Sequence, residues 1–153
     1  MKPRSVAILA LSASLLASAC GGGDDVSPEE FRSQANEVCR DIERQLDKIQ
    51  EVQPVTADQT EEQAEAIIDV SDQALGNLRK IDPPEDLQGG FDRYLEEREK
   101  AIEFVEQARD AAADKDSAAY EQAKRRLAAG QPTRRQIALD LGLGSCSRPS
   151  VPD

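Results

Sequence analysis

Three kinds of side chain in this sequence could take part in chemistry: abundant carboxylates, one cluster of cations and three cysteines. The 153 residues include no histidine, so the commonest general base and the commonest transition-metal ligand are both missing. No serine has a histidine or lysine arranged to activate it, and no glycine-rich loop follows a strand to hold a phosphate. The sequence therefore predicts no catalytic site, no metal site and no cofactor.

Carboxylates gather on two stretches with helical periodicity. They are Glu61, Glu62, Glu65, Asp69 and Asp72 on the first stretch, and Glu96, Glu97, Glu99, Glu103 and Glu106 on the second. A calcium or di-metal site is one interpretation, but di-metal bundles use Glu-x-x-His pairs and the EF-hand pattern is absent. We expect two solvated acidic faces instead.

Cations form one cluster in the last third of the chain. Its members are Lys124, Arg125, Arg126, Arg134 and Arg135, which lie on both sides of Pro132. They could bind an acidic partner or a phosphate, or they could balance helix dipoles and the acidic faces of neighbouring helices. The structural role is favoured, and the cluster is also the best candidate interaction site in the sequence.

Cys20 follows a segment that has the features of an export signal. Two basic residues come first, and residues 6–16 are uncharged over a length too short to span a bilayer. The small residues 17–19 and the cysteine resemble the bacterial lipobox, in which the cysteine thiol takes a diacylglyceryl group, although alanine replaces the usual leucine. We expect a signal peptide over 1–19, with an ordinary secretory signal and an unmodified cysteine as the alternative.

A lipid on Cys20 implies an anchor at the membrane. Residues 20–26 then form a flexible polar tether, which contains three glycines and two aspartates. The whole chain has a net charge of −11, and removal of 1–19 with its two basic residues leaves −13. Such a charge disfavours nucleic acid and anionic headgroups as partners. We expect a cell-membrane protein that is lipid-anchored on the extracytoplasmic face.

Cys39 and Cys146 form an even pair in a chain that is expected to be exported, which favours a disulfide. Cys39 falls beside the apolar stripe of the first expected helix, and a tail beyond Gly142 could fold back to meet it. The bond would stabilise the domain by about 4 to 5 kcal/mol, because it closes a loop of roughly 107 residues. Two free thiols or a metal pair are the alternative, but neither a C-x-x-C spacing nor a histidine supports a zinc site.

Helical spacing organises the chain after the tether. Apolar positions from Phe31 to Ile49 advance by three or four residues, after Ser27 as a cap and Pro28 as a favoured first residue. Three further amphipathic stretches follow. The first starts between 56 and 60 and ends before 82–84, the next extends from 84–90 to 113–115, and the last from 116–117 to Gly142.

The fold class predicted from these stretches is all-α, because no segment alternates with period two for the length of a strand. Short connections predict an antiparallel four-helix bundle over 27–148, with the fourth helix kinked or split at Pro132 and a frayed tail over 149–153. Leu, Ile, Val and Phe make up about a fifth of residues 20–153, a composition close to that of disordered chains. The alternative is a set of partly independent helices that fold only on a partner.

The layout also resembles the uncharacterised small helical lipoproteins of high-GC actinobacteria. The resemblance is carried by residues 20–24, by 35–40 in the first helix, by Pro83-Pro84 and by 141–143 shortly before Cys146. It implies the lipid anchor and the disulfide, and it brings no activity. We therefore expect a non-enzymatic module that contacts other proteins of the cell envelope, with a small-ligand or cation-binding lipoprotein as the alternative.

Overall fold

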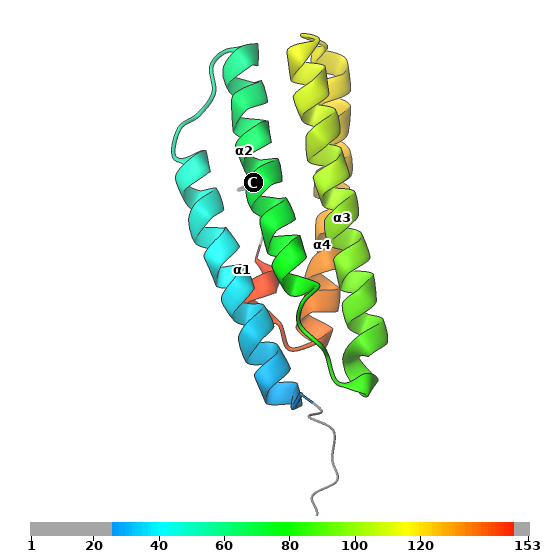
Figure 1. Ribbon diagram of the computed structural model, residues 1–153. Coiled ribbons are helices and arrows are strands. Elements are labelled where there is room, and N and C mark those ends of the chain that lie inside the picture. The colour runs from blue at the N-terminus through cyan, green and yellow to red at the C-terminus, as the bar shows by residue number, and fades with distance from the viewer. Residues whose placement is uncertain (1–25, 149–153) are drawn as a thin grey trace, which may run out of the picture.

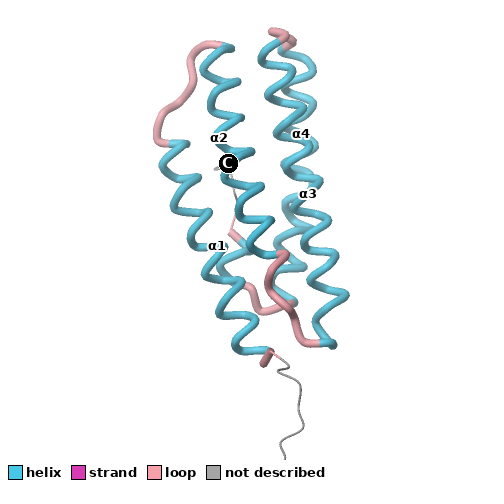
Figure 2. Tube along the Cα trace, in the orientation of Figure 1, coloured by secondary structure: helices cyan, strands magenta, loops and turns pink. Residues whose placement is uncertain are grey.

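The computed structural model describes residues 26–148. Within them the chain forms α1 (Pro28–Gln50), α2 (Ala57–Leu78), α3 (Glu85–Ala113), α4 (Ser117–Asp140) and the short 3-10 helix η1 (Gly144–Ser147). Successive helices run antiparallel, and no strand occurs in this part of the chain (Figures 1 and 2). The predicted all-α four-helix bundle is confirmed. The predictions for the signal peptide, for Cys20, for most of the tether and for the tail 149–153 concern residues outside those described.

The helices α1, α2 and α4 begin where a side-chain oxygen accepts from exposed backbone N–H groups, whereas α3 begins after Pro84 without such a bond. The hydroxyl of Ser27 accepts from the Glu30 N–H at 3.1 Å, and that of Thr56 accepts from the Gln59 N–H at 3.2 Å. The Asp116 carboxylate accepts two N–H groups at the start of α4, both at 3.0 Å. These contacts fix the starts of α1, α2 and α4 because they satisfy donors that have no partner inside the helix.

The end of α4 is set by Gly142, as its position in the sequence predicts. Its φ of 76° lies in the left-handed region, which glycine adopts without steric cost. The next N–H, that of Leu143, donates back to the Ala138 carbonyl at 2.7 Å, and Gly142 N–H donates to Leu139 at 3.0 Å. This pair of bonds ends the helix and turns the chain towards α1.

The prediction for the fourth helix was a kink or a split at Pro132; the helix is continuous through this residue, so it is not split. Proline lacks the N–H that would bind the Ala128 carbonyl, and this loss normally favours a break. Here the Arg134 side chain donates to the Leu127 carbonyl at 3.1 Å, next to the missing bond. Packing along α3 also supports α4 on both sides of the proline.

The core is largest at the end of the bundle where α1 begins. Phe31, Phe91, Tyr94, Leu78 and Leu143 are fully buried there. The rings of the two phenylalanines meet edge to face with centroids 5.0 Å apart. Towards the opposite end the buried residues become small, since alanines from α2, α3 and α4 fill that part of the interior. Alanine packing explains how a chain with few large apolar residues forms a bundle.

The bundle is closed unevenly. Packed pairs are formed by α1 with α2, by α2 with α3 and by α3 with α4, whereas α1 and α4 do not pack directly on each other in the described chain. The segment η1 lies between them and contacts both (Figure 1). The C-terminal part of the chain therefore takes the place of the missing α1–α4 interface.

Candidate functional site

The disulfide links α1 to η1, the segment that lies between α1 and α4. Cys39 and Cys146 are bonded, with their Cα atoms 5.0 Å apart and both side chains buried. The Tyr94 hydroxyl lies 3.9 Å from the Cys39 sulfur and donates to the Cys146 carbonyl at 3.5 Å. The structure thus contains the cysteine pair that the sequence predicts, and adds a buried tyrosine from α3 beneath it.

Burial raises the pKa of Tyr94, because an apolar interior disfavours the phenolate. The positive charges of Arg98 and Arg134 lower the same pKa to a smaller extent. The neutral hydroxyl is the form that can donate to the Cys146 carbonyl. The tyrosine therefore acts as a fixed donor that positions η1 against α3.

Polar side chains of α1 hold the same tail on its outer side. Arg32 Nε donates to the Leu141 carbonyl at 3.0 Å, and the Asn36 side-chain oxygen accepts from the Ser145 N–H at 2.8 Å. Farther along, Arg148 Nη1 lies 2.7 Å from Glu43 Oε1. The sequence pattern alone did not predict these contacts. The feature of the sequence that could have indicated them is the pair of polar residues Arg32 and Asn36, which lie four positions apart beside the apolar stripe of α1.

A cavity of about 220 Å³ opens beside the disulfide. Its walls include Cys39, Ile42, Glu43, Leu46, Asp47, Arg98, Cys146 and Arg148. Arg98 of α3 is partly buried at this wall. Carboxylates of α1 and guanidinium groups of α3 and the tail therefore face one small space.

The structure divides the predicted cation cluster in two. Arg134 is only 9% exposed, and its Nη2 donates to the Leu127 carbonyl at 3.1 Å. Desolvation lowers its pKa, the Arg98 charge lowers it further, and Glu97 and Tyr94 raise it. A Cβ on Gly130 would lie 2.5 Å from Arg134 Nη1, so the glycine makes room for the guanidinium. Arg134 is therefore a structural residue and is not available to a partner.

The other four cations are exposed on α4. Lys124 lies 3.4 Å from a carboxylate oxygen of Glu121 and 5.3 Å from the centroid of the Tyr120 ring. Arg126 Nη1 donates to the side chain of Gln107 on α3 at 3.3 Å. Arg125 and Arg135 have no hydrogen bond or ion pair with any residue between 26 and 148. Both can reach an external partner without breaking a contact of the bundle.

The carboxylates of α2 and α3 lie mostly at the surface, in agreement with the predicted acidic faces. On α3, Glu97 is 2.6 Å from Lys100, and Glu99 is 3.0 Å from Arg79 at the end of α2. Among the residues described, no group of three or more potential ligands is placed to hold a metal ion. The same part of the chain has no helix that is both long and apolar enough to span a bilayer.

Comparison of the chain with protein-family models, with curated proteins and with solved structures finds no match. The features of the described residues that bear on function are the disulfide between α1 and η1, the cavity beside that bond, and the exposed charges of α2 and α4.

Proposed function

We propose that this chain is an exported lipoprotein. A lipid on Cys20 anchors it in the cell membrane, and the helical bundle works on the extracytoplasmic face through contacts with other envelope proteins. The observation that carries the proposal is the buried Cys39–Cys146 bond. Disulfides of this kind persist in oxidising compartments outside the cytoplasm, which agrees with the export signal expected over 1–19.

The position of the first helix determines which end of the bundle would lie near the membrane. The first residue of α1, Pro28, follows Cys20 by eight positions, a span of at most about 28 Å. The start of α1 lies at the same end of the bundle as the end of α4 and the start of α3 (Figure 1). Acidic residues occupy the first turns of α1 and α3 at this end. Their charge disfavours contact with anionic headgroups and leaves the long sides of the bundle open to proteins.

A protein-contact role, without catalysis, also agrees with the environment of the buried titratable groups. Catalytic sites usually place such groups in a cleft, where substrate can reach them. The two buried groups with shifted pKa values, Tyr94 and Arg134, instead donate to backbone carbonyls of this chain. Both groups are used to hold η1 and α4 in place.

The anchor is tested by expressing the chain in a bacterial host and recording the intact mass of the mature protein. We expect acyl chains on Cys20 and partition into the detergent phase, both abolished by Cys20→Ser. Cys39→Ser is the matched control, since it removes a thiol and should leave the acyl mass unchanged. An unmodified Cys20 at the mature N-terminus would refute the anchor.

The protein-contact role is tested separately, by cross-linking in intact envelopes followed by a panel of hydrolase assays. We expect cross-links from the exposed residues of the bundle to defined envelope proteins, and no turnover above that of an equally anchored unrelated protein. Reproducible turnover that is lost on substitution of a cavity residue such as Asp47 would replace this role with an enzymatic one.

The cavity beside the disulfide favours one second candidate, a small-ligand-binding lipoprotein. Its opposed carboxylates and guanidinium groups would suit a small zwitterion better than an apolar molecule. Thermal shift of the full chain against free amino acids, calcium and magnesium distinguishes the two functions. A rise of several degrees at micromolar ligand, lost in Asp47→Asn, would favour ligand binding over protein contact.

A further inference from the structure

Charge is separated between two helices that lie on different sides of the bundle. The helix α2 carries six acidic residues and no basic one, whereas α4 carries five basic and two acidic residues. Both pack on α3, and they do not pack on each other in the described chain. The opposite charges therefore face solvent on separate surfaces and do not neutralise each other within one copy.

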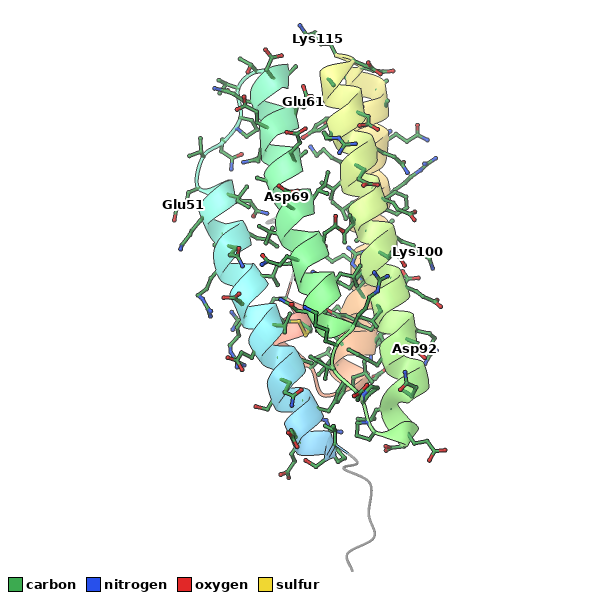
Figure 3. The ribbon with its side chains drawn as sticks, viewed as in Figure 1. Glu51, Glu61, Asp69, Asp92, Lys100 and Lys115 are labelled. Atoms are coloured by element: carbon green, nitrogen blue, oxygen red, sulfur yellow. A yellow bond between two sulfur atoms is a disulfide. The ribbon has the colours of Figure 1, made fainter. Side chains whose placement is uncertain are left out.

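The acidic surface of α2 is a single stripe, named here the α2 stripe. It consists of Asp58, Glu62, Glu65, Asp69 and Asp72, all exposed and spaced by four, three, four and three residues. Asp69 is exposed and lies about halfway along the helix (Figure 3). No side chain of the stripe has a hydrogen bond or a close ion pair with the described residues, although Glu65 contributes to the electrostatic field at Arg109. Like charges at such spacing repel one another, so a cationic partner would stabilise the helix.

A matching stripe follows the outer side of α4, named here the α4 stripe. It consists of Arg125, Ala128, Pro132, Arg135 and Leu139, all exposed and spaced by three, four, three and four residues. Two cations flank a middle section of small side chains, which would let another helix come close. Leu139 at the end is 48% exposed, which is unusual for a large apolar residue of this chain.

We propose that the α2 stripe of one copy docks antiparallel on the α4 stripe of a second copy. In this register Asp69 meets Arg125 and Asp58 meets Arg135. At a rise of about 1.5 Å per residue the two aspartates are about 16 Å apart along α2, and the two arginines about 15 Å apart along α4. Both ion pairs can therefore form together.

The exposed apolar residues decide the direction of the two helices. Within residues 26–148 the large hydrophobic side chains left exposed are Val52, Val55 and Leu139. Val55 lies three positions before Asp58, and Leu139 lies four positions after Arg135. Antiparallel docking brings the valine and the leucine together, whereas parallel docking leaves both in water. Burial of this pair favours the antiparallel arrangement.

A second copy fits these surfaces better than an anionic membrane does. A flat anionic surface would meet the cations of α4 but would repel the excess of acidic charge on α2 and α3, and it would leave the α2 stripe unpaired. A second copy matches both stripes. Because the two stripes occupy different faces, the contact is heterologous and can join more than two copies. The contact does not depend on the lipid. The second copy is inverted relative to the first, because α2 and α4 run in the same direction within one copy (Figure 1).

The test uses the full chain in a neutral detergent, as an equal mixture of unlabelled and ¹⁵N-labelled protein. A zero-length reagent that joins carboxylates to amines is added, and cross-linked peptides are identified by mass. We expect links of mixed isotope between Lys124, the neighbour of Arg125, and carboxylates of α2. Arg125→Glu with Arg135→Glu should reduce these links at least fivefold.

Charge exchange provides the decisive comparison. The double variant Asp58→Arg with Asp69→Arg should lose the mixed links when it is tested alone. Mixing it with the double variant Arg125→Glu, Arg135→Glu should restore them. Arg44→Glu with Arg93→Glu is the control, since it changes the net charge equally away from both stripes and should keep the links. Absence of mixed links in the wild type, or no restoration in the mixture, would overturn the proposal. The proposal would also be overturned if Lys124 were protected from the reagent only when phosphatidylglycerol vesicles are added and no mixed links formed. The cations of α4 would then bind lipid headgroups and not a second copy. The acyl mass on Cys20 is measured independently and is unaffected by any of these results.

Discussion

Removal of the Cys39–Cys146 bond should weaken the bundle at one place, the junction between α1 and η1. The bond closes a loop with a sequence separation of 107 residues. Chain entropy assigns such a loop about 4 to 5 kcal/mol, and measured losses for native disulfides are about 2 to 5 kcal/mol. Part of the junction survives without the bond, since Arg32 still binds the Leu141 carbonyl and Asn36 still binds the Ser145 N–H. We therefore expect Cys39→Ser with Cys146→Ser to lower the free energy of unfolding by about 3 kcal/mol.

Helix content should change little, because α2, α3 and α4 retain their mutual packing. The effect should concentrate in α1, whose backbone within residues 26–148 lies close only to α2 and η1, and whose main side-chain contact with α3 is the Phe31–Phe91 ring pair. Hydrogen exchange should accelerate most in η1 and in the half of α1 around Cys39. Amides in the middle of α3, which lies between α2 and α4, should remain the most protected.

The assay is thermal unfolding with and without reductant, combined with hydrogen exchange followed by mass spectrometry. For a domain of this size a loss of about 3 kcal/mol lowers Tm by roughly 10 °C. The double serine variant is its own control for the reagent, because its melting should not respond to reductant. If reduction leaves the wild-type melting unchanged, or if exchange accelerates equally in α3, then packing alone holds α1 and the reasoning is wrong.

Three further predictions concern single residues. Gly130→Ala should destabilise the protein by about 1 kcal/mol relative to Gly89→Ala, since a Cβ would displace the Arg134 guanidinium at the first site and meets no atom within 4 Å at the second. Equal urea midpoints for the two alanine variants would contradict this role of Gly130. Gly142→Ala should cost about 1 to 2 kcal/mol in urea unfolding, because a residue with a Cβ is strained at a φ of 76° and would also press on an arginine of α1. Tyr94→Phe should cost about 1 kcal/mol at pH 7 by loss of the bond to η1. Because burial raises the pKa of Tyr94, the folded wild type keeps a proton that the unfolded chain releases near pH 10. Wild-type stability should therefore fall as pH rises above about 10, and the phenylalanine variant should show a smaller fall over the same range.

Local chemistry made the helix starts and stops predictable from the sequence. Ser27, Thr56 and Asp116 accept from the first N–H groups of their helices, and Gly142 adopts the conformation that ends α4. Each of these effects depends on residues within a few positions of one another, so a sequence displays them directly. The disulfide was predictable for a different reason, since an even cysteine pair leaves few other roles in a chain that is expected to be exported.

The roles of Pro132 and Arg134 could not be predicted in the same way. Proline and a nearby glycine favour a break in an isolated helix. In the folded chain the same glycine admits the Arg134 guanidinium, which then binds a carbonyl next to the one that proline leaves unpaired. The pattern of five cations suggested one shared surface, but burial of a single member depends on the facing residues of α3. Sequence spacing carries no information on that tertiary contact.

The uneven closure of the bundle connects its stability with its surfaces. In a symmetric bundle, α1 and α4 would bury matching apolar stripes against each other. Here η1 and a disulfide occupy part of that interface, so α4 is held to the bundle by α3 and by the tail that continues from it. A helix held in this way needs only a narrow inner face, of which Ala123, Arg134 and Ala138 are buried. The rest of α4 is free to carry exposed cations and Leu139, while α2 carries the acidic residues that could meet them on another copy. The arrangement in which η1 and a disulfide occupy part of the α1–α4 interface therefore also leaves two complementary helix surfaces uncovered.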